Sequence, residues 1–244
     1  KVALVTGGAT GIGLGVASAL IAGSFTVIIT DVDEARGQRA AAEIGAHFLC
    51  HDVADEQAWE AVAVYVEHNY GYLDVLVNNA GIYLAGNIED TTVAAWTKIQ
   101  SVNVVGVLLG CKYGIRLMKS RGGAIINLSS GAALRPNSAA AVYSASKSAV
   151  WSLTRTTALH CAEQQYNIRC NSIHPGMVDT QMISNRAKSE EARKALYEKG
   201  HRKHPLGRMA RVEDITAAVV FLASEKAAYI TGVALPVDGG FAIN

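Results

Sequence analysis

Short, uninterrupted apolar runs alternate along the chain with longer stretches in which apolar residues recur every three to four positions. The runs are rich in Val, Ile and Leu and predict strands at residues 2–6, 25–30, 47–50, 75–77, 124–128, 168–173 and 233–237. The longer stretches predict helices at residues 12–22, 34–44, 56–69, 93–119 (with a break near its start), 142–165, 181–203 and 212–223. Strands that are apolar along their whole length are typical of a parallel sheet covered on both faces.

This alternation predicts an α/β fold, with one doubly wound, Rossmann-type parallel sheet and helices on both faces. The 244 residues contain no internal repeat and no linker rich in Pro, Gly and Ser, so we expect residues 1–244 to form a single domain. Ligands of such sheets bind beyond the carboxyl ends of the strands. We therefore expect the chemistry in the loops that follow the strands.

Composition narrows the classes of protein further. Half of the residues are hydrophobic and 18% are charged, which excludes a disordered chain. The net charge is +1 and the basic residues are scattered, which disfavours a nucleic-acid partner; the densest basic stretch, residues 201–204, is interpreted as a solvated loop or helix end. No apolar run reaches the ~20 residues of a membrane span. The four cysteines form no closely spaced set, which predicts no metal site and reduced, mostly buried thiols in a cytoplasmic protein.

A glycine-rich turn separates the first predicted strand from the first helix. Gly7, Gly11 and Gly13 allow a sharp turn and a close approach to a pyrophosphate, which the helix N-terminus would attract. The alternative is a tight turn without a ligand. Asp31 follows the second strand, where a carboxylate can bind both adenosine ribose hydroxyls and would repel a 2′-phosphate, so it favours NAD over NADP. Asp52 after the third strand could bind the adenine, or could only cap a helix.

Tyr143 and Lys147 lie four residues apart at the start of a predicted helix, and so on one face of it. A nearby ammonium lowers the pKa of a phenol and suits the tyrosine to acid–base catalysis. Taken alone, this spacing also fits a tyrosine and a lysine that lie next to each other on the protein surface without a catalytic role. Ser130 closes the preceding strand, and Asn103 is a polar amide within a long apolar helix, where it needs a binding partner or a local hydrogen bond.

With these motifs the chain resembles the short-chain dehydrogenase/reductase family over its whole length. The resemblance rests on the turn at residues 6–13, Asn78-Asn79-Ala80-Gly81, Asn103, Ser130, Tyr143-x-x-x-Lys147 and Pro175-Gly176. It implies a seven-stranded sheet in the order 3-2-1-4-5-6-7, with Asn103, Ser130, Tyr143 and Lys147 as the catalytic residues.

The resemblance also implies NAD as the cofactor and assigns its contacts. Gly7, Gly11, Ile12 and Gly13 would surround the pyrophosphate, Asp31 the ribose, and Asp52 and Val53 the adenine. Asn79, Ala80 and Gly81 would lie beside the adenosine ribose, Lys147 would also bind the nicotinamide ribose next to Tyr143, and Pro175, Gly176, Val178 and Thr180 would border the nicotinamide.

The expected reaction is the interconversion of a small secondary alcohol and a ketone. We expect the substrate wall at residues 83–84, 134–142 and 177–205. Its apolar members (Leu134, Ala139, Ala140, Ala141, Val142 and Met182), with no basic cluster aimed at the centre, favour a neutral hydrophobic substrate such as a cyclic alcohol or hydroxysteroid. Residues 181–205 are interpreted as a lid over the substrate or as an exposed helical pair.

Two rival functions remain open at this point. A 3-oxoacyl carrier-protein reductase would resemble NADP users and often carries basic residues at the mouth of the site, and Asp31 counts against it. A catalytically silent NAD-binding scaffold is the second rival. Relatives of this kind are commonly homotetramers, and residues 104–109 and 145–159 are apolar enough for such contacts or for an ordinary core.

Overall fold

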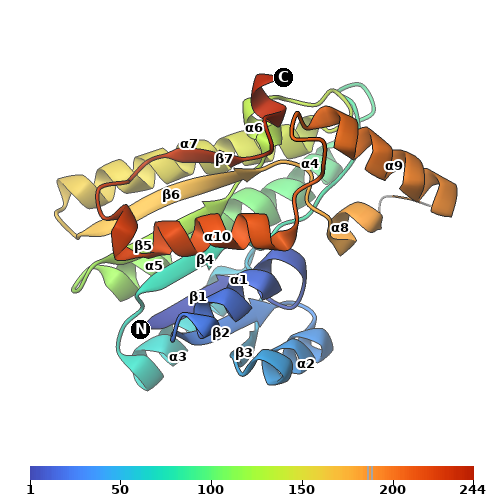
Figure 1. The fold of residues 1–244 in the computed structure, drawn as a ribbon. Coiled ribbons are helices and arrows are strands. Elements are labelled where there is room, and N and C mark those ends of the chain that lie inside the picture. Colours follow the sequence, from blue (N-terminus) through green and yellow to red (C-terminus); the bar gives the residue numbers. More distant parts are fainter. Residues whose placement is uncertain (186, 188) are drawn as a thin grey trace.

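Seven parallel strands form the central sheet of the computed structural model, in the order β3-β2-β1-β4-β5-β6-β7 (Figure 1). This order confirms the prediction. The structure describes residues 1–185, 187 and 189–244. The strands are β1 (Val2–Thr6), β2 (Thr26–Asp31), β3 (His47–Cys50), β4 (Val75–Asn78), β5 (Gly123–Leu128), β6 (Ile168–Pro175) and β7 (Ala234–Val237).

Helices cover both faces of the sheet. Alternate side chains of each strand point to opposite faces: Leu4 packs in one core with Trp59 and Val107, whereas Val5 packs in the other with Val16. Burying each such side chain stabilises the fold by about 1.5–3 kcal/mol. Helices α3 (Glu56–Tyr70), α5 (Gly106–Met118) and α7 (Ala141–Glu163) supply the first core, and α1 (Gly11–Ala22), α2 (Glu34–Ile44) and α10 (Val212–Ala223) supply the second.

Local signals in the sequence set the ends of several helices. The Asp33 carboxylate accepts a hydrogen bond from a backbone N–H in the first turn of α2 at 3.0 Å, and Asp55 does the same for α3 at 2.8 Å. Gly45 and Gly71 end these two helices with φ of +74° and +77°, a conformation that favours glycine. These caps explain why the predicted boundaries of both helices agree with the structure to within one residue.

The predicted helix at residues 93–119 is interrupted, as expected, near its start. Helix α4 (Val93–Gln100) passes through a π-helical turn, η1 (Ser101–Val105), into α5. The whole stretch Val93–Met118 is long and apolar enough, by length and composition, to cross a membrane. A helix of a protein core passes the same test, and α5 packs against α3, α7, β4 and β5.

The polar stretch at residues 181–203 contains two helices, α8 (Gln181–Ser184) and α9 (Glu190–Lys203). Residues 186 and 188 of the predicted lid lie outside the described part of the chain. Figure 1 shows α8 and α9 at one end of the molecule, beyond the carboxyl end of β6. Three short elements were not predicted: α6 (Gly131–Leu134), η2 (Glu225–Ala227) and η3 (Phe241–Ile243).

Candidate active site

Lys147 and Tyr143 lie one turn apart near the start of α7. The Lys147 side chain is buried, and its Nζ atom donates a hydrogen bond to the Leu128 carbonyl at 2.7 Å. The same Nζ lies 5.9 Å from the centre of the Tyr143 ring. Burial lowers the pKa of Lys147 to about 8, because a charge is disfavoured away from water. At neutral pH the ammonium is therefore still largely protonated, in a position that favours a negative charge on nearby oxygens.

Ser130 follows β5 and begins the short helix α6. Its hydroxyl accepts a hydrogen bond from the Ala132 N–H at 3.1 Å. Its carbonyl accepts one from Nδ1 of His174 at 3.1 Å, and Nε2 of the same ring lies 2.9 Å from the Ser172 hydroxyl. Burial is the main cause that lowers the pKa of His174, so the ring is neutral and holds the backbone of Ser130. No motif in the sequence marks His174 as part of the site.

Asn103 is fully buried in the π-helical turn. Its side chain accepts a hydrogen bond from the Ile82 N–H at 2.8 Å and donates to the Ile82 carbonyl at 3.0 Å and to the Ser146 hydroxyl at 3.1 Å. The amide is therefore satisfied by partners distant in sequence rather than within its own helix. A Cβ atom on Gly81 would lie 3.2 Å from Oδ1 of Asn103 and 3.4 Å from Nζ of Lys147. Asn103 thus fixes the loop after β4 against α7, beside Lys147.

The glycine-rich turn has the shape of a phosphate cradle. Gly7 and Gly11 adopt φ of +63° and +54°, and a Cβ on Gly13 would lie 2.2 Å from the Gly7 carbonyl oxygen. The Asn79 amide donates to two backbone carbonyls of the turn at 2.9 and 3.0 Å. Thr10 makes no side-chain capping bond, so the first N–H groups of α1 are left for a ligand. These features fit the pyrophosphate of a dinucleotide.

The carboxylates expected at the adenosine end lie after β2 and β3. One Asp31 oxygen accepts a hydrogen bond from the Ala9 N–H at 3.2 Å, so this carboxylate lies directly against the glycine-rich turn. Asp52 is exposed and accepts a hydrogen bond from the Ala54 N–H at 2.9 Å. The Val53 side chain is buried in the protein core, and its carbonyl accepts a hydrogen bond from Nε1 of Trp59 at 3.0 Å. Ala80 lies beside the same turn, with its N–H donating to Thr6 at 3.1 Å.

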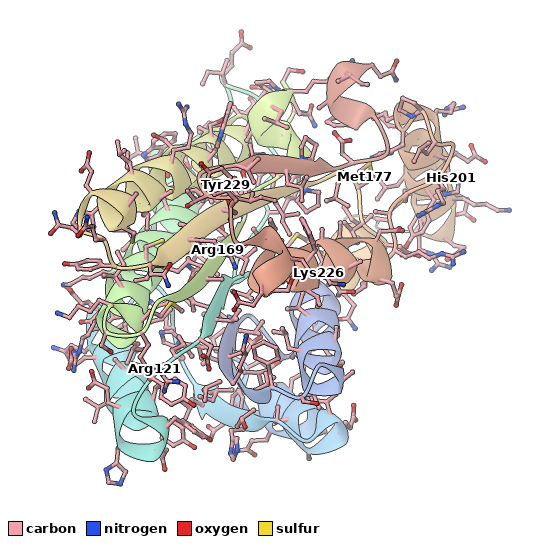
Figure 2. The ribbon with its side chains drawn as sticks, turned by 60° about the vertical axis from the view of Figure 1, so that its left-hand side comes forward. Arg121, Arg169, Met177, His201, Lys226 and Tyr229 are labelled. Atoms are coloured by element: carbon pink, nitrogen blue, oxygen red, sulfur yellow. The ribbon has the colours of Figure 1, made fainter. Side chains whose placement is uncertain are left out.

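The segment after Pro175 is held from two sides. A Cβ on Gly11 would lie 3.5 Å from Cγ2 of Thr180, which places the end of this segment over the glycine-rich turn. At its start, the Met177 N–H donates to Nε2 of His204 at 3.0 Å, and Nδ1 of that ring lies 2.6 Å from the Gly200 carbonyl. Figure 2 shows Met177 next to α9, the helix that carries His201. Residues 201–203 form a helix end, as predicted, but His204 is buried rather than solvated.

These segments meet around a cavity of about 280 Å³. The Tyr143 ring lies in its wall, with the Tyr83 ring 5.0 Å away. The predicted site residues that line the cavity are Ile12, Asn79, Gly81, Ser130, Tyr143, Lys147, Pro175, Gly176, Val178 and Thr180. The remaining ones, Gly7, Gly11, Gly13, Asp31, Asp52, Val53, Ala80 and Asn103, lie outside its lining.

The cavity wall differs in part from the expected one. Of the predicted apolar residues, Ala139, Ala140 and Met182 line it. Leu134, at the end of α6, and Ala141 and Val142, at the start of α7, are not among the lining residues; Val142 is buried in the protein. The predicted wall segments also supply Leu196, Arg135, Lys199 and Lys203, whereas Phe241 lines the cavity from outside those segments. Arg135, Lys199 and Lys203 are basic, so the wall is less uniformly apolar than its predicted apolar members indicate.

Comparison with known proteins connects this geometry to a family. A family model described as enoyl-(acyl carrier protein) reductase matches residues 7–242. The chain belongs to the short-chain dehydrogenase/reductase family. Two similar members are the NADP-dependent (R)-specific alcohol dehydrogenase of Lentilactobacillus kefiri, 36% identical over 99% of this chain and 96% of that protein, and the 3-beta-hydroxysteroid dehydrogenase of Comamonas testosteroni, 41% identical over 98% and 94%.

A solved structure agrees with this assignment. Ligand-free aldohexose dehydrogenase (AldT) of Thermoplasma acidophilum superimposes with a TM-score of 0.92 and 32% identity, covering 100% of this chain and 94% of that one. Family membership and these relatives show that this short-chain dehydrogenase/reductase is an oxidoreductase of alcohol or ketone groups that uses a nicotinamide cofactor.

Proposed function

We propose that the protein is an NAD-dependent dehydrogenase that interconverts a secondary alcohol and a ketone. The observation that carries this proposal is the convergence of Tyr143, Lys147 and Ser130 on one cavity, whose lining reaches the first turn of α1 at Ile12. A phenol, a buried cation and a hydroxyl at one surface are the groups that proton transfer at a carbinol oxygen requires.

In the oxidation direction, the Tyr143 oxygen accepts the proton of the substrate hydroxyl. The Ser130 hydroxyl forms a hydrogen bond to the same substrate oxygen and orients it. Lys147 favours the deprotonated phenol through its charge and would also bind the nicotinamide ribose. When bound, the nicotinamide supplies the hydride acceptor for the carbinol carbon. General acid–base catalysis by a positioned side chain typically raises the reaction rate by a factor of about 10²–10⁴.

Asn103 is the fourth residue of the proposed catalytic site, and its role is to position a water molecule. We propose that the Asn103 side chain holds a water molecule that links Lys147 to solvent and relays protons between them. Its contacts with Ile82 and Ser146 support this role, because they fix the amide beside Gly81 and the Lys147 ammonium.

Some of the remaining proposed cofactor contacts line the cavity, and the others lie beyond its lining. Gly7, Gly11, Ile12 and Gly13 would hold the pyrophosphate, and Asp31, Asp52, Val53, Asn79, Ala80 and Gly81 the adenosine. Pro175, Gly176, Val178 and Thr180 would border the nicotinamide, with the Val178 backbone and the Thr180 hydroxyl at its carboxamide. The uncapped start of α1 and the closeness of Thr180 to Gly11 support this arrangement.

NAD is favoured over NADP by the charge of Asp31. Its carboxylate lies against the glycine-rich turn at Ala9, where it can bind two ribose hydroxyls and would repel a 2′-phosphate. The neighbouring residues Thr10 and Val32 carry no positive charge that would offset this repulsion.

We propose a substrate with a hydrophobic body, such as a cyclic alcohol or a hydroxysteroid. The support is the apolar side of the cavity at Ala139, Ala140, Met182 and Leu196, together with the activity named for the Comamonas testosteroni relative. The described parts of residues 181–205 act as a lid, because Met182, Leu196 and Lys199 line the cavity from this segment.

One domain, residues 1–244, would carry the whole activity, and we place it in the cytoplasm. The rival function, a 3-oxoacyl carrier-protein reductase, gains support from the basic residues in the cavity wall. Asp31 still counts against this function, because such reductases commonly use NADP and the Asp31 carboxylate would repel its 2′-phosphate.

A substrate panel tests the proposal. The purified protein is assayed by the absorbance of the reduced nicotinamide with cyclohexanol, a 3-beta-hydroxysteroid and, in the reverse direction, an acetoacetyl thioester, each with both cofactors. We expect the alcohols to be oxidised with a higher kcat/KM for NAD than for NADP. Preferential reduction of the thioester with NADPH would favour the reductase, and NAD binding without turnover of any compound would favour a silent scaffold.

A further inference from the structure

His174 lies near the end of β6 and is fully buried, and the acid–base chemistry proposed above does not use its ring. Nδ1 lies 3.1 Å from the Ser130 carbonyl oxygen, and Nε2 lies 2.9 Å from the Ser172 hydroxyl. The ring of Trp151, on α7, packs edge-on against the imidazole with 5.8 Å between the ring centres. A buried ring with partners at both nitrogens has one fixed orientation, so it can hold the group that it contacts.

The His174 ring continues the hydrogen bonding between β5 and β6 beyond the strand ends. Pairing of the two strands reaches Ser129, whose N–H donates to the Ile173 carbonyl at 2.9 Å. At the next residue, Ser130, a side chain of β6 takes the place of a backbone group, because His174 contacts the Ser130 carbonyl. The same carbonyl accepts from the Ala133 N–H at 3.0 Å in the first turn of α6. Ser130 is therefore held from both its own helix and the neighbouring strand.

The partners of the ring decide which nitrogen carries the proton. A carbonyl oxygen can only accept, so the Nδ1 atom that faces Ser130 is the donor. Burial lowers the pKa of His174, and the charge of Lys147 acts in the same direction. The ring is thus neutral at pH 7, and Nε2 accepts from the Ser172 hydroxyl. That hydroxyl also lies 3.3 Å from the Val233 carbonyl, which already accepts the Ser172 N–H at 2.9 Å, so its proton is available to Nε2.

The Ser130 hydroxyl points the effect of this contact into the site. Its oxygen accepts from the Ala132 N–H at 3.1 Å, which leaves the hydroxyl proton to donate to a substrate oxygen. Ser130 lines the cavity, whereas His174 is not among the lining residues. A shift of about 1 Å in a positioned group can lower a rate by about 100-fold. The ring can therefore affect the reaction only through the placement of Ser130.

We propose that His174 is a positioning residue for the reaction: its Nδ1–H holds the Ser130 carbonyl and thereby fixes the hydroxyl that orients the substrate oxygen. This inference rests on the proposed function and adds to it a residue that touches neither substrate nor cofactor. Ser172 belongs to the same arrangement, because its hydroxyl sets the tautomer in which Nδ1 is the donor.

Two amide variants, each of which keeps one half of the imidazole, test the inference. The amide nitrogen of His174→Asn can take the place of Nδ1 and donate to the Ser130 carbonyl, whereas that of His174→Gln takes the place of Nε2 beside Ser172. With cyclohexanol and NAD, we expect His174→Gln to lower kcat by about tenfold or more with little change in KM, and His174→Asn to recover kcat to within about threefold of the wild type. Both variants lose the packing against Trp151, and a melting temperature measures that loss. Equal kcat values of the two variants would overturn the inference.

A double-mutant cycle tests whether His174 acts through Ser130. Ser130→Ala removes the hydroxyl that His174 positions, so adding His174→Gln to it should lower kcat by less than about twofold further. Trp151→Phe, which changes the packing of the ring but not its bond to Ser130, is the matched control and should keep kcat near the wild-type value. Multiplicative effects of Ser130→Ala and His174→Gln would overturn the inference and leave the dehydrogenase proposal intact.

The tautomer of His174 is measured without turnover. In long-range ¹H–¹⁵N NMR spectra of protein labelled with ¹⁵N-histidine, the His174 signals are assigned by their absence from His174→Asn, and we expect the proton on Nδ1 at pH 7. A proton on Nε2 would overturn the inference. A protein with the expected tautomer that oxidises no alcohol would keep the hydrogen bond to Ser130 and lose the proposed function, and with it the role of His174 in turnover.

Discussion

Lys147 holds a charge where water does not reach it. The side chain is 5% exposed, and only burial shifts its pKa, from 10.5 to about 8. A buried ammonium favours the unfolded state, in which it is hydrated, whenever it is protonated. The hydrogen bond to the Leu128 carbonyl offsets part of this cost. At the scale of the residue, the proposed site therefore lowers the stability of the fold in order to keep a cation beside a phenol.

Replacing Lys147 with Met tests this cost. Because the folded pKa is lowered, the unfolded chain binds more protons between pH 8 and pH 10.5, and the penalty is fully present below pH 8. We expect Lys147→Met to raise the free energy of unfolding at pH 7 by about 2 kcal/mol, allowing for the lost hydrogen bond. The advantage should shrink as the pH rises from 8 to 10.5, as measured by urea denaturation. A variant less stable than the wild type at pH 7 would contradict this description.

At the scale of elements, His204 joins the end of α9 to the segment after β6. Its ring accepts from the Met177 N–H and contacts the Gly200 carbonyl, and a Cβ on Gly176 would lie 2.5 Å from Nε2. The close contact shows why only glycine fits there. This joint sets the distance between the proposed lid and the segment proposed to border the nicotinamide.

His204→Ala should loosen this joint. The partly buried Met177 N–H would lose its acceptor, which costs on the order of 1 kcal/mol. We expect a lower free energy of unfolding and a several-fold weaker affinity for NAD, measured by fluorescence titration. His204→Gln, which keeps an acceptor, should recover part of the affinity. His201→Ala, on the exposed side of the same helix, serves as the matched control, and an equal effect of both alanine variants would argue against the joint.

The elements themselves could be predicted where the local pattern decides them. Asp33, Gly45 and Gly71 mark helix ends in the sequence, and the structure agrees. Helix α6 was missed because four residues are too few to show a helical period. The π-helical turn could not be predicted from the sequence either, because the hydrogen-bond partners of the Asn103 amide, Ile82 and Ser146, are distant in sequence.

At the scale of the whole molecule, several apolar side chains are exposed on the helices of one face. Trp96, Val105, Leu108 and Leu159 on this face are 38–60% exposed. The elements that carry them, α4, η1, α5 and α7, contact one another. Exposed apolar patches of this kind mark protein interaction sites. We propose that they pack between the subunits of a homotetramer.

A charge placed on this patch tests the proposed tetramer. We expect the wild-type protein to have four times the mass of the chain by light scattering, and Leu108→Glu to yield smaller species, because burying an unpaired carboxylate is costly. Val64→Glu, an equally exposed position on α3, should leave the mass unchanged. A wild-type protein that is monomeric at all concentrations would refute the proposal.

The fold of the whole molecule follows from the sequence more completely than its cavity does. The apolar runs and their order predict the sheet, because each strand must be covered on both faces. The motif residues converge for the same reason, since they follow strand ends at one edge of the sheet. The cavity wall depends instead on where α9 and Phe241 pack. Within residues 201–204, interpreted from the sequence as a solvated loop or helix end, Lys203 lines the cavity and His204 is buried beside it.

Tyr143→Phe tests most directly whether the Tyr143 hydroxyl transfers the substrate proton. Rapid-mixing turnover with cyclohexanol and NAD should fall by at least about 100-fold in this variant, while NAD affinity and melting temperature stay near the wild-type values. Tyr83→Phe, whose ring lies 5.0 Å away in the same cavity, should retain its rate within a few-fold. A Tyr143→Phe protein that oxidises the alcohol as fast as the Tyr83→Phe protein would contradict the claim.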